Sequence, residues 1–371
     1  MRNLLIFSAI LLAAGCTSTA PAESTAAAGP AAPDTAQVPF KTYTALQFYD
    51  TVSYSIAAGR GRCFSPDGQS LLTTSDETGI FNAYAMSLDG TKTALTQSVG
   101  DSTFAESFFP SDGRVLVEAD GGGNELSHVF VRETDGTLTD LTPGEKTRAY
   151  FLGWSQDGAT FFVASNARDE ETDDVYAYSA ADYSSRMIYQ NDGLEIGAIS
   201  PDGELLALVK NVSSADADIY LYDLSADAPA RTLITPHEGN VAYTTHGFTP
   251  DSRNLVYGTN QHGEFTEAWT HDVGTGEKAA LVSADWDVLS VGFSPSGRYR
   301  VSTVNADGLW EVTLLDTLTG QPVALSGVPG GEVSQVCFND DETRVAFGVN
   351  TDTSPRNIYT CLLYTSPSPR D

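Results

Sequence analysis

The sequence predicts an all-β protein, a seven-bladed β-propeller of four-stranded blades whose last blade is incomplete. A five-residue turn motif recurs seven times. Its fourth position falls at 67, 112, 157, 202, 251, 296 and 341, so the intervals are 45, 45, 45, 49, 45 and 45 residues. Each repeat has room for four short strands, and no long segment has helical periodicity, a combination typical of propeller blades.

The motif begins with a large apolar residue and usually ends in Asp-Gly, as in FSPDG at 64–68 and ISPDG at 199–203. Ser, Pro, Asp and Gly favour a tight turn, here between the first and second strands of a blade. The residue before the motif is small in six repeats, and Phe108 is the exception. Small residues at this position would let inner strands approach the propeller axis.

An aromatic residue about 18 positions after the turn indicates the third strand of most repeats. These aromatics are Tyr84, Phe130, Tyr176, Tyr220, Trp269 and Tyr359. In the seventh repeat only 19 residues follow Asp341 up to and including Thr360, so we expect it to lack its outer strand. Residues 41–54 or a following sequence could supply that strand, and an open edge otherwise invites aggregation.

The two ends differ from the repeats. Arg2, an apolar run and the sequence Leu-Ala-Ala-Gly-Cys ending at Cys16 resemble a bacterial lipoprotein signal. We therefore expect a signal peptide at 1–15, a lipid on Cys16, a disordered linker over 16–39 and a propeller over 40–360. In such signals a residue other than Asp after the cysteine, here Thr17, implies the outer membrane rather than inner-membrane retention, so we expect an outer-membrane or periplasm-facing lipoprotein in the bacterial envelope. The alternative is an ordinary signal peptide that contains a cysteine.

Residues 361–371, CLLYTSPSPRD, match eleven consecutive codons of a transposase sequencing adapter. We interpret them as an artefact and exclude them from the fold. The natural sequence is then expected to be interrupted at Thr360, within its gene.

Charge limits the possible partners. The chain has 49 acidic and 20 basic residues, a net charge of −29. Nucleic-acid phosphates and anionic membranes both require basic surfaces, so neither is an expected partner. We expect membrane contact only through the lipid on Cys16.

No residue set indicates a metal, a cofactor or a catalytic centre. The histidines, at 128, 237, 246, 262 and 271, lack metal-ligand spacing, and the acids of 169–174 do not match a calcium loop. The near-matches to a nucleophile elbow at 153–157 and 292–296 are the repeat's own turn. Cys63 and Cys337 occupy equivalent positions in the first and seventh repeats. A disulfide between them is conceivable, but two small, unpaired buried thiols are the favoured interpretation.

Runs between the turns resemble the N-terminal propeller of the prolyl oligopeptidase family of serine peptidases. They lie at 75–79, 123–126, 189–193, 218–224 and 284–288, within a resemblance that covers 43–360. The resemblance implies a following α/β-hydrolase domain with Ser, Asp and His, over which the propeller restricts access to short peptides. No position of this chain matches those three residues, so we expect the chain itself not to hydrolyse peptides.

Two other functions stay open: a complete periplasmic propeller lipoprotein that binds a protein, and a propeller enzyme with a central metal. The loops between second and third strands are acidic, and we call their carboxylates the acidic rim. The rim could attract cationic peptide N-termini in the full-length enzyme, or simply reflect an acidic protein. Its members are Asp76, Glu77, Glu125, Asp169, Glu170, Glu171, Asp173, Asp174, Asp216, Asp218, Glu264, Glu267 and Asp307.

Overall fold

The computed structural model describes residues 42–325 and 327–363, and the chain divides into two compact units between Thr51 and Val52. The described part of the first unit contains one short helix, α1 (Ala45–Tyr49). Thr44 caps it: the Gln47 N–H donates to the Thr44 hydroxyl, and the Gln47 side chain accepts from the Thr44 N–H at 2.9 Å. This reciprocal pair is a capping box. No helix among the described residues is long and apolar enough to cross a membrane.

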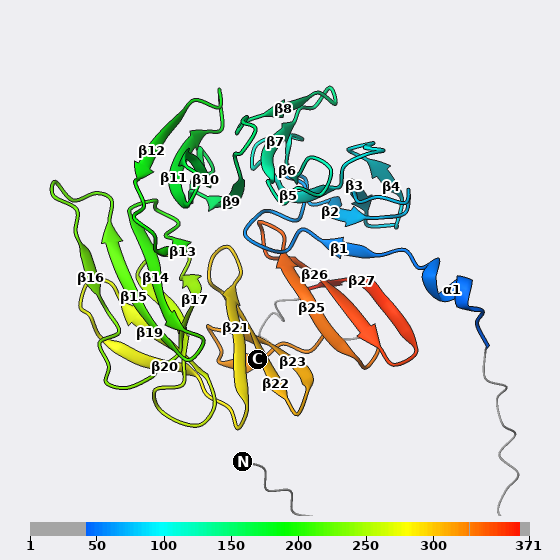
Figure 1. The fold of residues 1–371 in the computed structure, drawn as a ribbon. Coiled ribbons are helices and arrows are strands. Elements are labelled where there is room, and N and C mark those ends of the chain that lie inside the picture. The colour runs from blue at the N-terminus through cyan, green and yellow to red at the C-terminus, as the bar shows by residue number, and fades with distance from the viewer. Residues whose placement is uncertain (1–41, 326, 364–371) are drawn as a thin grey trace, which may run out of the picture. The chain divides into compact units, whose positions relative to one another are not determined.

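The second unit is a seven-bladed β-propeller (Figure 1). Each blade is an antiparallel meander in which strands pair in chain order. The first three blades comprise β1 (Tyr54–Ile56), β2 (Ser70–Ser75), β3 (Asn82–Ser87), β4 (Lys92–Ala94); β5 (Thr103–Phe108), β6 (Val115–Ala119), β7 (His128–Arg132), β8 (Leu138–Asp140); and β9 (Ala149–Trp154), β10 (Thr160–Asp169), β11 (Thr172–Ser179), β12 (Ser185–Tyr189).

The remaining blades follow the same plan. They comprise β13 (Glu195–Ile199), β14 (Leu205–Ser213), β15 (Asp216–Asp223), β16 (Arg231–Leu233); β17 (Tyr243–Phe248), β18 (Asn254–Thr259), β19 (Glu267–Asp272), β20 (Lys278–Val282); β21 (Asp287–Phe293), β22 (Tyr299–Ala306), β23 (Leu309–Asp316), β24 (Gln321–Pro322); and β25 (Glu332–Phe338), β26 (Arg344–Thr351), β27 (Ser354–Leu362). The predicted fold class, including the incomplete last blade, is confirmed.

The recurring turn joins the first two strands of each blade, and its chemistry is local. In blade 1 the Ser65 hydroxyl donates to Asp67 at 2.6 Å, and the same carboxylate accepts the Gln69 N–H at 3.0 Å. Hydrogen bonds from Ser65 and Gln69 lower the pKa of Asp67. Gly68 has φ of +66°, a left-handed conformation that glycine adopts without strain. The motif therefore serves to build a turn.

Seven hydrophobic clusters hold the ring together, one between each pair of neighbouring blades. The cluster between blades 2 and 3 includes Phe109, Val131, Phe151 and Phe161, all at most 3% exposed. The cluster between blades 7 and 1 closes the circle, and it contains Cys63 and Cys337. Each blade thus buries both faces only when its two neighbours are present.

The innermost strands are irregular. In blades 2 to 7 the register shifts between the first and second strands, which marks a β-bulge on the axial side. A bulge leaves one residue unpaired and redirects its side chain. Glu106 occupies this position in β5 and His246 in β17. Sequence periodicity did not reveal these bulges.

The seventh blade has three strands, as predicted, and β27 includes Cys361 and Leu362 of the segment that we interpreted as adapter-derived. Residues 45–49 form helix α1, so the described part of 41–54 does not add a strand to β27. The predicted signal peptide, Cys16 and the whole predicted linker over 16–39 lie outside the described residues.

Candidate functional site: an axial cavity and its arginine loop

The antiparallel meander defines two faces of the propeller. Turns between first and second strands, and between third and fourth strands, lie on one face, which we call the turn face. Loops between second and third strands, together with the connections from blade to blade, lie on the other, the loop face. The axial cavity opens among the turns, whereas the acidic rim belongs to the loop face.

The axial cavity has a volume of about 360 Å³, near the lower end of small-ligand pockets. The leading apolar residue of the turn motif contributes to its wall from five blades. These residues are Phe64, Trp154, Phe248, Phe293 and Phe338. Pro201, Pro250 and Pro295, from the same turns, add further apolar surface. The repeat that builds the ring therefore also gives the cavity an aromatic wall.

Residues 58–62 form the arginine loop, which carries Arg60 and Arg62 into the same cavity. Ile56 pairs with Thr73 and Phe64 with Leu71, so seven residues oppose Leu72 alone. The backbone hydrogen bonds of Leu72 to Ala57 and Cys63 close the base of this excursion. The first blade therefore replaces the single-residue bulge of the other inner strands with a loop that bears two positive charges.

Blade 2 holds the arginine loop in place. The Arg62 N–H donates to the Ser107 hydroxyl at 2.9 Å, and the Arg62 carbonyl accepts from the Phe108 N–H at 2.9 Å. A Cβ atom at Gly61 would overlap the carbonyl oxygen of Glu106, so only glycine fits there without displacement. The Arg62 guanidinium pairs with Asp340 of blade 7 at 2.5 Å.

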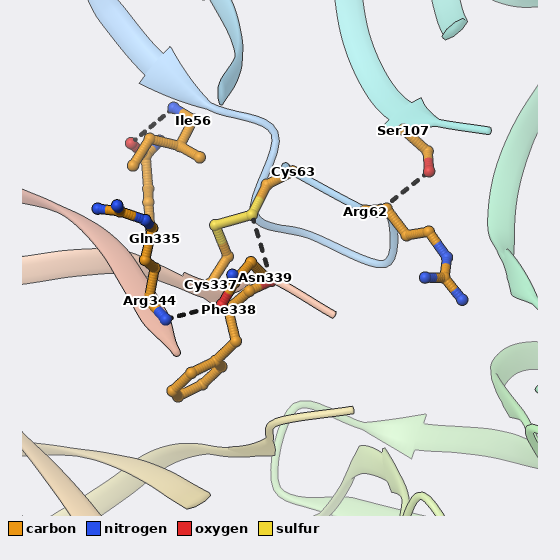
Figure 2. Close-up of a disulfide and its surroundings, with 9 residues drawn as sticks. All are labelled: Ile56, Arg62, Cys63, Ser107, Gln335, Cys337, Phe338, Asn339 and Arg344. Carbon is orange, nitrogen blue, oxygen red and sulfur yellow. Dashed lines mark hydrogen bonds between the residues drawn. A yellow bond between two sulfur atoms is a disulfide. The ribbon is translucent and has the colours of Figure 1, made fainter. Parts of the chain in front are cut away.

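A disulfide joins Cys63, the residue directly after the arginine loop, to Cys337 of blade 7 (Figure 2). Their Cα atoms lie 6.6 Å apart, within the range that a disulfide spans. The favoured interpretation of two unpaired buried thiols is therefore wrong. Ring closure brings the two inner strands together, and the nearby Ile56 N–H donates to Gln335 across the same seam at 3.1 Å.

Two carboxyl groups of blade 2, Glu106 and Glu118, lie recessed near Arg60. Burial raises the pKa of Glu106 to about 8, and the neighbouring Glu118 adds to the shift while Arg60 opposes it. Burial also raises the pKa of Glu118 to about 7, against a 2.7 Å hydrogen bond from the Phe151 N–H and the charge of Arg60. Near neutral pH the pair consequently retains a proton, so its charge only partly compensates Arg60.

His246 lines the cavity from blade 5, and its Nε2 atom is buried without a hydrogen-bond partner among the described residues. Burial lowers its pKa to about 4, which keeps the ring neutral at physiological pH. Of the other histidines, His128 pairs with Asp140 at 2.9 Å and His237 with Asp216 at 3.0 Å. Residues 42–325 and 327–363 contain no group of three or more metal-ligating side chains that could hold an ion.

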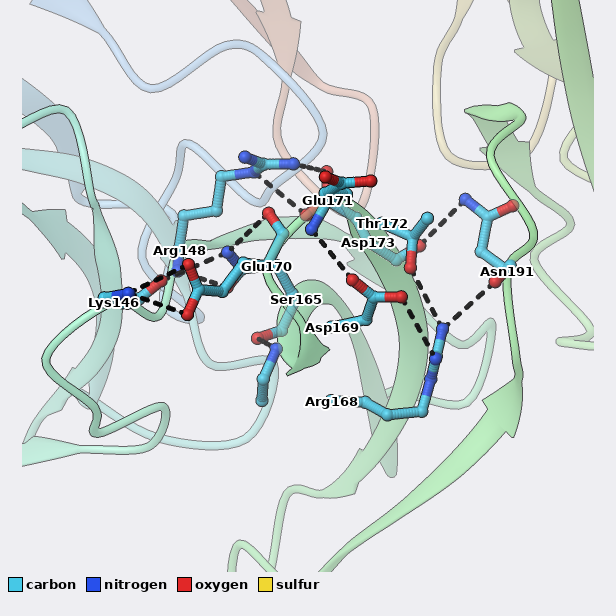
Figure 3. Close-up of polar contacts among 12 residues, drawn as sticks. Lys146, Arg148, Ser165, Arg168, Asp169, Glu170, Glu171, Thr172, Asp173 and Asn191 are labelled. Atoms are coloured by element: carbon cyan, nitrogen blue, oxygen red, sulfur yellow. Dashed lines mark hydrogen bonds and ion pairs between the residues drawn. The ribbon is translucent and has the colours of Figure 1, made fainter.

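The blade 3 part of the acidic rim is paired locally (Figure 3). In blade 3, Glu170 pairs with Lys146 at 3.0 Å and Asp173 with Arg148 at 3.0 Å. Asp174 is fully buried and accepts from the Arg168 guanidinium at 2.6 Å. These basic partners reduce the field that the rim carboxylates present to a ligand.

The serines of the near-match motifs lie in turns, as the repeat predicts. The Ser155 hydroxyl donates to Asp157 at 2.6 Å, and the Ser294 hydroxyl accepts from the Tyr299 N–H at 2.9 Å. Neither hydroxyl forms a hydrogen bond with a histidine of the described part of the chain. The arginine loop and the aromatic wall of this cavity give it the means to bind a ligand.

Sequence analysis did not identify Arg60, Arg62, Glu106, Glu118 or His246 as site residues. One signal was available: Arg-Gly-Arg at 60–62 is a concentrated positive charge in a strongly acidic chain. Glu106 and His246 gave no signal, because their positions depend on bulges in β5 and β17. Glu118 lies in β6 opposite Phe104, and its repeat position carried no signal either.

Comparison with known proteins gives the fold. No protein-family model matches the chain, and no curated protein matches it. A prolyl endopeptidase from a study of inter-domain dynamics is 16% identical, with a TM-score of 0.63, over 85% of this chain and 48% of that chain. Prolyl oligopeptidase B from Galerina marginata, bound to a 35mer hydrolysis and macrocyclization substrate, is 12% identical, with a TM-score of 0.60, over 86% and 49%.

An oligogalacturonate lyase in complex with manganese is also similar, at 16% identity and a TM-score of 0.64. That match covers 85% of this chain and 92% of the lyase. The chain thus spans about half the length of the two peptidases and nearly all of the lyase. At these identities the likeness establishes a shared propeller fold.

Proposed function

We propose that this chain is the propeller domain of a secreted prolyl oligopeptidase family serine peptidase. In this proposal the lipid on Cys16 anchors the protein to the bacterial envelope, facing the periplasm. A following α/β-hydrolase domain performs peptide hydrolysis, and the propeller limits its substrates to short peptides. The propeller does not bind nucleic acid and takes no cofactor.

The observation that carries the proposal is the narrow axial cavity with the arginine loop inside it. A volume of about 360 Å³ accommodates a few residues of extended chain. A folded domain of 100 residues has a radius of gyration of about 13 Å, so it would be excluded. The sequence runs that resemble peptidase propellers, and the structural match to the corresponding share of two peptidases, support the same assignment.

The first test is the DNA beyond codon 360, amplified across the junction with residues 361–371. We expect the reading frame to continue for about 250 residues, the size of one further large domain, with Gly-x-Ser-x-Gly before an Asp and a His. A frame that closes within a few tens of residues would overturn the assignment.

The second test measures gating in the recovered full-length enzyme. Arg60→Gly removes a side chain from the cavity and leaves the blades intact, so kcat/KM for longer peptides should rise several-fold relative to shorter ones. Arg253→Gly is the matched control, because the Arg253 side chain is 73% exposed and lies outside the cavity lining. If kcat/KM depended on peptide length in the same way in both variants, gating through this cavity would be contradicted.

The alternative is a self-contained periplasmic lipoprotein that acts as a protein-binding module. The observation that favours it is the match to 92% of an oligogalacturonate lyase, in which a fold of this size forms nearly the whole protein. A short reading frame after codon 360 would support this alternative, and a copurifying envelope protein would then be sought by crosslinking.

A further inference from the structure

The axial cavity combines an apolar wall with two guanidinium groups on one fixed loop. Arg60 is exposed and makes no ion pair or hydrogen bond with any residue in the described ranges. Arg62 is paired with Asp340, but both side chains keep solvent access, at 27% and 52% exposed. Counting these three side chains, the cavity mouth carries one net positive charge, in a protein whose total charge is −29.

The loop holds the two arginines at a defined spacing before any ligand arrives. Gly61 between them is fixed against blade 2, Arg62 makes two hydrogen bonds through its backbone, and Cys63 is crosslinked to Cys337. In Figure 2 the Arg62 guanidinium extends away from the disulfide. A preorganised loop loses little conformational entropy when it binds, which favours affinity. Guanidinium groups also match carboxylates in geometry and charge.

The rest of the lining limits what such a carboxylate can be attached to. Phe248, Phe293 and Phe338 are partly exposed and present apolar surface to the cavity. The hydroxyls of Ser155 and Ser294 are engaged within their own turns, so they are poorly placed to satisfy a sugar's hydroxyl groups. An apolar or aromatic side chain next to the carboxylate fits this wall better than a polyhydroxylated ring.

We propose that the axial cavity binds the C-terminal carboxylate of a short peptide whose last side chain is apolar or aromatic. Arg60 forms the main ion pair with that carboxylate, Arg62 adds a second donor, and the aromatic wall holds the terminal side chain. This inference goes beyond gating and does not require a following catalytic domain, so a short reading frame after codon 360 would leave it intact.

The groups that face Arg60 make the binding pH-dependent. Glu106 and Glu118 are the acidic neighbours, and Tyr150 is also within electrostatic range. Burial raises the pKa of Tyr150 to about 12, so it stays neutral below that pH. When both glutamates ionise above about pH 8, they compensate Arg60 more fully and compete with a ligand carboxylate.

The test uses calorimetric titration of the full chain with two probes that differ in one group. One is acetyl-Ala-Pro-Phe with a free C-terminal carboxylate, and the other is its C-terminal amide. We expect the acid to bind at least tenfold more tightly than the amide at pH 7. Arg60→Gln should remove most of that difference, and Arg60→Lys should retain part of it. The acid should bind several-fold more weakly at pH 9 than at pH 7, and Glu106→Gln should reduce this loss, because Glu118 alone then ionises beside Arg60.

Arg253→Gln controls for net charge, because it removes one positive charge at an exposed site outside the cavity lining. It should leave the preference for the acid unchanged. Equal binding of acid and amide, absence of binding at millimolar probe, or the same loss from Arg253→Gln would each overturn the proposal. So would Arg60-dependent binding of digalacturonate in place of the peptide, which would assign the cavity to sugar acids.

Discussion

The loop of blade 3 at the acidic rim and the arginine loop on the axis both carry several charged side chains. They differ in whether those side chains have oppositely charged partners. In the rim, Asp174 is buried against Arg168, and Glu170 and Asp173 have basic partners within 3.0 Å. On the axis, Arg60 has no direct partner among the described residues, and the nearby glutamates retain a proton near neutral pH. Dense charge in the sequence therefore marks a stabilised loop in one region and a candidate ligand contact in the other.

The disulfide supports the axial region, and its removal should have the largest effect. Cys63→Ser with Cys337→Ser should lower the free energy of unfolding by about 3–5 kcal/mol, because the crosslink spans 274 residues of sequence. Urea denaturation under non-reducing conditions measures the change. Cys361→Ser, which removes the free thiol of β27, is the control. A loss below about 1 kcal/mol would mean that blades 7 and 1 are held by packing alone.

The buried ion pair of blade 3 should come next. Asp174 accepts the Arg168 guanidinium at 2.6 and 2.9 Å and the Asn191 N–H at 2.7 Å. Asp174→Asn removes the charge and places an amide group against the guanidinium, so we expect a loss of about 2–4 kcal/mol. Chemical denaturation at pH 7 tests this expectation. A near-neutral effect would show that the rim is stabilised mainly by its backbone pairing.

Glu106→Gln should change how the free energy of unfolding depends on pH, which tests whether the carboxyl near Arg60 is protonated in the folded protein. The folded-state pKa of about 8 exceeds the ordinary value of 4.5, so the folded protein binds this proton more tightly than the unfolded chain. Ionisation of Glu106 consequently opposes folding, and its stabilising contribution is lost as the pH rises from about 4.5 to about 8. The variant should match the wild type at pH 5 and exceed it by about 1–3 kcal/mol at pH 9.

Thermal unfolding of both proteins across this pH range measures that difference. Parallel stability curves for Glu106→Gln and the wild type would mean that the Glu106 carboxyl is well hydrated in the folded protein. The proposed competition between Glu106 and a ligand for Arg60 would then lose its basis.

The smallest expected effect is at an exposed pair of the rim. The Lys146 and Glu170 side chains are 68% and 65% exposed, so solvent screens their attraction. Glu170→Gln should change the free energy of unfolding by less than about 0.5 kcal/mol. Asp174→Asn in the same denaturation assay gives the matching value for a buried carboxylate. The comparison shows whether the stability loss depends on burial of the carboxylate or only on its closeness to a basic group. Equal losses in the two variants would contradict that distinction.

Local chemistry explains why the propeller was predictable. Ser65, Asp67 and Gly68 build their turn within five residues, and the same pattern returns about every 45 residues. The strands between turns need only apolar residues and an aromatic such as Tyr84, which lies in β3. Each prediction rested on contacts between residues close in sequence, so the chain could be interpreted one repeat at a time.

The axial cavity could not be predicted in this way. Glu106 and His246 face the axis because bulges break the two-residue alternation of their strands, and a bulge leaves no clear mark in composition. The error over Cys63 and Cys337 had a related cause. Sequence spacing gives no distance between the first and last blades, whereas ring closure places the two Cα atoms 6.6 Å apart.

The sequence by itself determined the number of blades, their turns, the incomplete last blade and the acidic character of the loop face. Each follows from short-range patterns that repeat. Only the tertiary structure decided which charges meet, which cysteines pair and which side chains enter the axial cavity. Those outcomes depend on closing a ring in which the cysteines that join the first and last blades are 274 residues apart in sequence. They also depend on backbone irregularities that lie among the packed inner strands.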